Sequence, residues 1–253
     1  VYPARGKRAA AGTGDCVGAG SRLRRLRAYP AGTAARGRRR GLPRTVGHSA
    51  GTEALRGIIR ASDDWGIEAL TIYAFSTENW ARPQDEVGAL MRLLLQYFAS
   101  EIDELDEKNV RITILGDKDA LPPRQRDVLR EAERRTLENT GLRLNIAINY
   151  GARAELARAA RQIAQEVQSG TLDLSQVDEK ALSDRLYTHD LPDVDLLIRT
   201  SGEMRLSNFL LYQCAYAEFL FPTVLWPDFT VEDYHRCIAQ FQGRKRRFGK
   251  REE

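Results

Sequence analysis

The chain has 253 residues, with 39 Lys and Arg against 35 Asp and Glu, a formal net charge of +4 and a hydrophobic fraction of 42%. This length and apolar content suit a single α/β domain of ordinary size. Three cysteines without a CxxC pair exclude a disulfide scaffold or a zinc ribbon, and favour a reducing compartment. The apolar runs are shorter than the ~20 residues that span a bilayer, and no signal-peptide pattern is present.

The basic excess is confined to the first fifth of the chain. Residues 1–50 hold 12 Lys and Arg and one acid, a net of +11, whereas residues 51–253 hold 27 Lys and Arg and 34 acids, a net of −7. Residues 1–39 are rich in Arg, Ala and Gly and keep no lasting hydrophobic period, which predicts a poorly ordered or mis-translated segment. Residues 40–249 are predicted to form the folded domain.

The remaining chain alternates predicted helices and strands. Thr52 is predicted to cap a helix reaching about Trp65, before Gly66. The hydrophobic periods then predict a strand over 69–75, a long helix over 85–108, a strand over 110–115, a helix over 122–140, a strand over 142–149, helices over 153–169 and 178–187, a strand over 194–199, short apolar pieces at 217–221 and 224–226, and a helix from the cap Thr230 to about residue 242.

This alternation predicts an α/β fold, in which a mostly parallel sheet is flanked by helices within one domain. Ligands of such sheets bind at the carboxyl ends of the strands. Three predicted strands are followed by polar segments, at residues 76–80, 149–151 and 200–203. We therefore expect the functional site at this edge, and no Walker loop, GxSxG or HExxH motif accompanies it.

Four arginines lie in or beside these segments, and two serines are close to them: Arg44, Arg82, Arg199, Arg205, Ser201 and Ser207. The planar guanidinium binds oxyanions in a bidentate manner, and backbone N–H groups complete such cradles, so the set favours a diphosphate ligand. Any one of these arginines taken alone is more commonly an ordinary surface residue. Their shared position at strand ends is what favours the binding interpretation.

Three other residues each allow two interpretations. Glu218 stands in an apolar, strand-like run, where a carboxylate is costly unless it pairs with an arginine or binds a cation. His48 precedes the predicted helix, whose N-terminus suits an anion, although a lone histidine is usually structural. Trp80 follows a strand end, where an indole packs in the core more often than it lines a ligand site.

Ordered motifs over residues 40–249 resemble the cis-prenyltransferase family, and most closely its bacterial undecaprenyl or shorter polyprenyl diphosphate synthases. The matching segments are Arg40-Gly41, Arg44, Gly47-His48 and Gly51; Tyr73-Ala74-Phe75-Ser76-Thr77-Glu78-Asn79-Trp80 with Arg82-Pro83; Asn149-Tyr150-Gly151; Arg199-Thr200-Ser201-Gly202-Glu203 with Arg205 and Ser207-Asn208-Phe209; and Ala215-Tyr216-Ala217-Glu218.

The resemblance implies repeated cis condensation of isopentenyl diphosphate onto an allylic diphosphate, farnesyl or geranyl, with Mg²⁺ as cofactor. It implies that Arg199, Arg205, Leu206 and Ser207 bind isopentenyl diphosphate, and that Arg44 and His48 contact the allylic diphosphate. Residues Ser76, Thr77 and Glu78 would form a substrate loop, with Trp80 and Arg82 beside it. Asn79 would be the catalytic residue; since an amide is a weak base, it can instead orient the true proton acceptor. Glu218 would be a magnesium ligand.

The resemblance also implies a homodimer, because Arg247 and Gly249 match a terminal Arg-x-Gly that reaches across the family's dimer. Helix 85–108 and strand 142–149 would line a tunnel for the growing chain, with Leu144 at its floor. The expected location is the cytoplasm, with peripheral membrane contact through the lipid product, and no nucleic-acid partner is implied.

The sequence departs from the family at its N-terminus. The family carries an essential aspartate in an MDGNGRWA segment upstream of the RG motif, and ungapped extension places Ala31 at the aspartate and Arg36 at the tryptophan. The apolar strand that precedes this segment is also expected to be absent here. Loss of a metal ligand at a diphosphate removes several kcal/mol of transition-state stabilisation, so impaired activity is predicted.

Two explanations compete for this N-terminus. A frame error in a GC-rich gene would produce a sequence rich in Arg, Ala and Gly that changes abruptly into the family's sequence, and this explanation is favoured. A non-catalytic partner subunit is the alternative, although such a subunit has little reason to keep the motifs around Asn79 and Arg199. A weaker alternative from composition alone is nucleic-acid binding through the basic arm.

Overall fold

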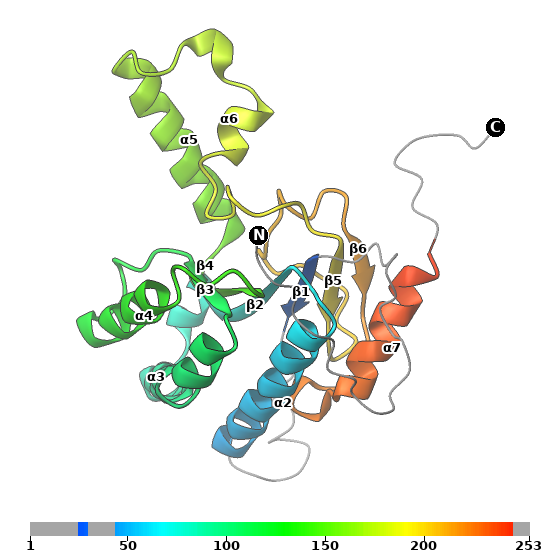
Figure 1. Cartoon of the computed structure of the whole chain (residues 1–253). Helices are drawn as coiled ribbons and strands as arrows, with labels where there is room; N and C mark the ends of the chain where they lie inside the picture. Colours follow the sequence, from blue (N-terminus) through cyan, green and yellow to red (C-terminus); the bar gives the residue numbers. More distant parts are fainter. Residues whose placement is uncertain (1–24, 30–43, 245–253) are drawn as a thin grey trace, which may run out of the picture.

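Six strands form one parallel sheet at the centre of the molecule. The computed structural model describes residues 25–29 and 44–244. Within this part the strand order is β3-β4-β2-β1-β5-β6, and every neighbouring pair is parallel (Figure 1). The predicted α/β class, with a parallel sheet flanked by helices, is confirmed. The strands are β1 (Arg25–Tyr29), β2 (Ala69–Ser76), β3 (Arg111–Leu115), β4 (Arg143–Tyr150), β5 (Leu196–Arg199) and β6 (Glu218–Leu220).

The helices mostly match their predicted spans. They are α2 (Arg44–Asp64), α3 (Gln84–Glu107), α4 (Pro123–Arg135), α5 (Ala152–Gln168), α6 (Glu179–Ser183) and α7 (Val231–Gln242), with short 3₁₀ turns η1 (Thr77–Ala81), η2 (Leu174–Gln176) and η3 (Trp226–Asp228). Helix α7 begins as predicted, because the Thr230 hydroxyl accepts the backbone N–H of Asp233 at 3.1 Å.

Three predicted helix ends are wrong: the start of α2, the end of α4, and the end of α6, which stops at Ser183 rather than at residue 187. Helix α2 begins at Arg44, directly after a proline, so Thr52 lies inside it rather than at its cap. His48 therefore lies within the helix and does not precede its N-terminus. Helix α4 ends at Arg135, before the predicted residue 140, and Thr136, its C-cap residue, is tied to β3 because its Oγ1 accepts the N–H of Ile112 at 3.0 Å.

Strand β1 corrects the prediction that no strand precedes residue 40 and that residues 1–39 are poorly ordered throughout. Arg25–Tyr29 lies between β2 and β5 and pairs with both, and its Leu26 side chain is fully buried. A central strand is required there, because the backbone groups of β2 and β5 would otherwise face each other unpaired. Only Leu26 and Ala28 alternate with arginines, so the pattern was too short to detect. The rest of the 1–39 segment lies outside the described residues.

Side chains of the strands alternate between two apolar clusters, one on each face. The larger cluster packs Leu70, Ile146 and Ile198 against helices α2, α3, α4 and α7. The smaller cluster contains Tyr73 and Leu197 and is covered by the segment that includes Phe209, Leu210 and Cys214. The two faces are buried by different parts of the chain, and the carboxyl edge is left for the polar segments.

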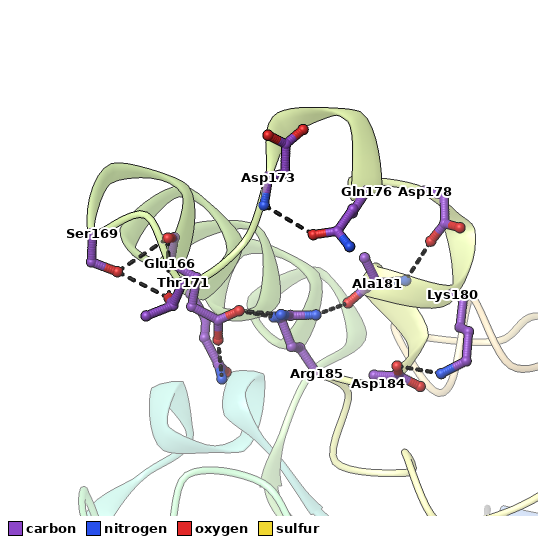
Figure 2. Close-up of polar contacts among 11 residues, drawn as sticks. Glu166, Ser169, Thr171, Asp173, Gln176, Asp178, Lys180, Ala181, Asp184 and Arg185 are labelled. Atoms are coloured by element: carbon purple, nitrogen blue, oxygen red, sulfur yellow. Dashed lines mark hydrogen bonds and ion pairs between the residues drawn. The ribbon is translucent and has the colours of Figure 1, made fainter.

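Helices α5 and α6 form an arm that projects away from the sheet (Figure 1). The Glu166 carboxylate accepts the Arg185 Nε–H at 2.8 Å, and Arg185 Nη1 donates to Ala181 O at 2.6 Å (Figure 2). These contacts hold the two sides of the arm together. Its tip exposes Leu174.

Candidate active site at the carboxyl edge of the sheet

The segments that follow β2, β4 and β5 meet at one edge of the sheet. Asn208 Nδ2, after β5, donates to Glu78 Oε1, after β2, at 2.7 Å. The backbone oxygen of Asn208 accepts the N–H of Ala152, at the start of α5, at 2.8 Å. The pairing of β2 with β4 shifts register between Tyr73 and Phe75 and again between Phe75 and Ser76, just before the loop. The structure thus brings together the three polar segments singled out in the sequence.

Arg199 is the centre of a compact cradle after β5. Its side chain is 2% exposed, and Nη1 donates to Arg205 O and to Ser207 Oγ, both at 2.9 Å. Ser207 and Asn208 both have positive φ values, 51° and 62°, which fold the segment tightly around the guanidinium. Leu206 packs its side chain against the smaller apolar cluster. Arg199, Arg205 and Ser207 are therefore neighbours, as a shared diphosphate site requires.

Glu203 supplies a carboxylate to this cradle. It contacts Arg199 Nη2, and its Oε2 lies 2.7 Å from Arg205 Nη2. Burial alone would raise the pKa of Glu203, but the hydrogen bond and charge of Arg199, with Arg205, hold that pKa below its ordinary value. Two guanidinium groups thus face one carboxylate, which leaves a net positive charge for an anionic ligand.

Asn79 is fixed through its side-chain oxygen. Its Oδ1 accepts the backbone N–H of Ser76 at 3.0 Å, across the start of η1. The amide nitrogen of Asn79 is a donor only, so the arrangement suits a group that orients a ligand rather than one that removes a proton. Thr77 and Glu78 lie in the same turn. Hydrogen bonds, led by that of Asn208, lower the pKa of Glu78 despite the opposing effect of burial.

Trp80 and Arg82 continue the loop after β2. Trp80 Nε1 donates to Asn149 Oδ1 at 2.8 Å, and its ring packs edge-on against Phe75 at 5.1 Å between centroids. Trp80 is therefore part of the scaffold that joins the loop after β2 to the end of β4. Arg82 Nη1 lies 2.9 Å from Glu86 Oε1.

An apolar cavity of about 210 Å³ begins beside this loop and lies between β2, α2 and α3. Ser76, Asn79 and Arg82 contribute to its wall, and the remaining lining includes Leu90 and Leu94 from α3. Ile146 of β4 lines the cavity as well. Leu144, two residues earlier on the same face, is fully buried in the core instead. The cavity thus has polar residues beside the loop and an apolar remainder.

Glu218 forms an ion pair with arginine, one of the two interpretations that its position allowed. Its Oε2 lies 2.6 Å from Arg244 Nη1. Across residues 25–29 and 44–244, no group of three or more His, Cys, Asp or Glu side chains is placed to hold a metal. Any divalent cation would therefore rely on few carboxylates from this part of the chain.

The remaining predicted residues are only partly placed. Arg44 and His48 belong to the first turns of α2, and their side chains lie outside the described part of the structure. Arg247 and Gly249 also lie outside the described residues.

Two contributions were not assigned from the sequence. In the sequence, Asn149 and Asn208 belong to the matching motifs but have no predicted role. In the structure, the side chain of each joins two separate segments. The local signal was only an asparagine near the end of a strand or in a polar turn, because the partners of both side chains lie at least 32 residues away in the sequence. None of the described helices is long and apolar enough to cross a membrane.

Known proteins resemble this chain in sequence. A family model described as "Putative undecaprenyl diphosphate synthase" matches residues 33–249. The isoprenyl transferase of Clostridium perfringens is 46% identical over 212 residues, covering 84% of each chain, and that of Brucella abortus is 51% identical over 210 residues, covering 83% of each.

Two solved structures are similar to this chain in fold and sequence. Lavandulyl diphosphate synthase from Lavandula x intermedia, solved with dimethylallyl diphosphate, superimposes with a TM-score of 0.87 at 34% identity, covering 90% of this chain and 98% of that one. A probable undecaprenyl diphosphate synthase from Campylobacter jejuni gives a TM-score of 0.74 at 34% identity, covering 90% and 99%.

The fold and site therefore define an enzyme class that transfers prenyl groups. The chain belongs to the undecaprenyl diphosphate synthase family of cis-prenyltransferases, as the resemblance in the sequence indicated.

Proposed function

We propose that this chain condenses isopentenyl diphosphate onto an allylic diphosphate, farnesyl or geranyl, to extend a polyprenyl diphosphate in cis. The observation that carries the proposal is the cradle of Arg199, Arg205 and Ser207 beside the loop of Asn79 and the apolar cavity. The cradle would hold the diphosphate of isopentenyl diphosphate, and Arg44 and His48 would hold the allylic diphosphate. The cavity would receive the growing hydrocarbon.

In this reaction the allylic carbon–oxygen bond breaks, diphosphate leaves, a carbon–carbon bond forms to isopentenyl diphosphate, and one proton is lost. Charge builds on the departing diphosphate, so fixed cationic groups stabilise the transition state. Asn79 would orient the reacting group through its amide nitrogen, because its oxygen is held by Ser76. Ser76, Thr77, Glu78, Trp80 and Arg82 would position the substrate around it.

Mg²⁺ is the proposed cofactor, and the described residues fit it only in part. Mg²⁺ is commonly held by one or two carboxylates together with substrate phosphates. Glu218 is the proposed protein ligand, although in this chain it pairs with Arg244 and lies at the start of β6 beside Leu196, at the end of the sheet opposite to the cradle, so it would serve the site of a second subunit. When bound, the ion would neutralise charge on the diphosphate. The family match begins at residue 33, after Ala31 at the aspartate position, which supports impaired turnover of this chain.

The proposal includes a homodimer joined through the segment of Arg247 and Gly249. Met204, between Glu203 and Arg205 of the cradle, is 79% exposed, as a residue that meets a second subunit would be in a single chain. A cytoplasmic location, with peripheral membrane contact through the product, is proposed from the chemistry of the substrates and from the three cysteines, which form no CxxC pair.

The test is incorporation of labelled isopentenyl diphosphate onto farnesyl diphosphate with Mg²⁺. It compares the chain with a variant that restores the family segment by Pro30→Met, Ala31→Asp, Thr33→Asn, Ala34→Gly, Ala35→Arg and Arg36→Trp. We expect little turnover by the chain and clear turnover by the variant. Equal turnover would refute the importance of the aspartate, and no turnover by either would contradict the proposed activity.

A non-catalytic partner subunit is the second candidate, and the alanine at position 31 is the observation that favours it. It predicts that the restored variant stays inactive alone, while the unmodified chain raises the activity of a catalytic cis-prenyltransferase chain that is mixed with it.

A further inference from the structure

Asn208 uses both ends of its side chain to join two substrate-binding segments. Its Nδ2 donates to Glu78 Oε1 at 2.7 Å, and its Oδ1 accepts the backbone N–H of Arg153 at 2.9 Å. Asn208 directly follows Ser207, whose hydroxyl accepts from Arg199. One residue therefore contacts the loop after β2 and the first turn of α5, and is covalently joined to the arginine cradle.

The local backbone is shaped for this contact. Asn208 has a φ of 62°, a left-handed conformation that asparagine and aspartate adopt more readily than most residues. Gly151 lies against the same point, and a Cβ there would come within 2.7 Å of Asn208 Nδ2 and 2.6 Å of Thr77 Oγ1. The three segments are thus in contact at the site, with no room for another side-chain atom between them.

We propose that Asn208 is a positioning residue that latches the loop of residues 76–82 to the diphosphate cradle, so that occupation of the cradle orders the loop that carries Asn79. The inference rests on the proposed function, since it takes the cradle as the site of isopentenyl diphosphate. Asn208 itself is not required to touch substrate. Its role is to couple the order of the loop to the presence of a ligand in the segment around Arg199.

The side-chain chemistry allows one half of the latch to be broken alone. In Asn208→Asp an oxygen still accepts from Arg153 N–H and the left-handed φ is still tolerated, but the donor to Glu78 becomes a second carboxylate. Glu78→Gln alone keeps an acceptor for Asn208. In the double variant Asn208→Asp with Glu78→Gln, the glutamine amide donates to the new aspartate, so the contact is restored with reversed polarity.

A matched control is available on the other side of the molecule. Asn139 Nδ2 donates to Asp106 Oδ1 at 3.0 Å and to Val110 O at 3.0 Å, between α3 and the turn after α4. Asn139→Asp therefore introduces the same clash of carboxylates without touching the site.

The experiment is backbone hydrogen exchange read by mass spectrometry on residues 76–82, first without ligand. We expect on the order of fivefold faster exchange in Asn208→Asp, and near-normal exchange in Glu78→Gln, in the double variant and in Asn139→Asp. Unchanged exchange in Asn208→Asp, or failure of the double variant to restore it, overturns the latch.

Isopentenyl diphosphate is then added, with its binding followed by calorimetry. Binding should slow exchange over residues 76–82 in the unmodified chain and not in Asn208→Asp; equal slowing in both overturns the coupling. Absence of binding to the unmodified chain contradicts the proposed function instead, and the ligand-free exchange still decides whether the latch exists.

Discussion

The carboxylate of Glu203 lies against the guanidinium of Arg199, a side chain that is almost fully buried. The same carboxylate contacts the more exposed Arg205 at 2.7 Å. Glu203 is thus an internal counter-ion within the proposed diphosphate cradle. An incoming diphosphate must share the two arginines with it, and this gives the first prediction.

Glu203→Gln should bind inorganic pyrophosphate more tightly, by about tenfold, because it removes a negative charge close to the ligand. Calorimetry at low ionic strength measures this directly. Glu131→Gln, which alters an exposed pair with Arg134 far from the site, serves as the control and should leave the affinity unchanged. Unchanged or weaker binding by Glu203→Gln would show that the carboxylate does not compete with the ligand.

The stability effect of Glu203 should depend on pH. Its pKa is lowered in the folded state from an ordinary value of 4.5, so its contribution is fully present above 4.5 and is lost as pH falls through the lower folded value. Glu203→Gln should therefore unfold at lower urea concentration than the unmodified chain at pH 7, and the two should converge below pH 4.5. If the two proteins differed in unfolding urea concentration by the same amount at every pH, Glu203 would not be the group responsible for the difference.

Asn79 offers a test of orientation against proton abstraction. Asn79→Asp keeps an acceptor for the Ser76 N–H and gains a stronger base, but loses the amide donor. If the donor orients the reacting group, kcat of the restored variant should fall on the order of 10²-fold with Asn79→Asp. An unchanged or raised kcat would mean that a base is what the position requires.

Leu94 lines the apolar cavity from α3 and should influence product length. Leu94→Trp fills part of a volume of about 210 Å³, so the restored variant should release shorter polyprenyl diphosphates. Leu137→Trp makes the same exchange at a position that is 52% exposed and should leave the product unchanged. Chromatography of the products after removal of phosphate decides; unaltered length with Leu94→Trp would argue against the cavity as the product site.

Gly151 is in close contact with Thr77 of the loop after β2 and with Asn208 of the segment after β5. Gly151→Ala would place a Cβ 2.6 Å from Thr77 Oγ1, so the loop after β2 must move. We expect KM for isopentenyl diphosphate in the restored variant to rise by about tenfold. In Gly243→Ala the new Cβ would lie 3.7 Å from the backbone oxygens of Ala239 and Gln240, an ordinary contact, so no such effect is expected. An equal response of both glycines would exclude a specific role for Gly151.

The centre of the sheet was predictable because strands β2 and β4 have eight residues each, are mostly apolar and are bounded by turns. Strand β2 and helix α3 were predicted within a residue or two, since the periods of residues 69–75 and 85–108 are unambiguous. The sequence did not predict strand β1, because only Leu26 and Ala28 show the apolar alternation of a strand. Its conformation depends instead on pairing with β2 on one side and β5 on the other, which no local pattern shows. The start of α2 was missed because Thr52 has the chemistry of a cap yet lies inside a helix.

The candidate site was predictable at the level of its loops. Parallel strands place their carboxyl ends at one edge, so the convergence of the segments holding Asn79, Gly151 and Arg199 follows from topology. The individual side-chain contacts could not be predicted from the topology. Whether Glu218 meets an arginine or a cation, and which groups Asn149 and Asn208 join, depends on distances between segments that no local pattern specifies.

The most direct test of the central claim is calorimetric titration of the unmodified chain with isopentenyl diphosphate, compared with Arg205→Ala. Arg205 is 61% exposed, so its removal should leave the fold intact. We predict saturable binding by the chain and a loss of at least about tenfold in affinity with Arg205→Ala, while Arg236→Ala, 62% exposed on α7, has no effect. Equal affinity in all three proteins, or no binding at all, would contradict the assignment of the cradle.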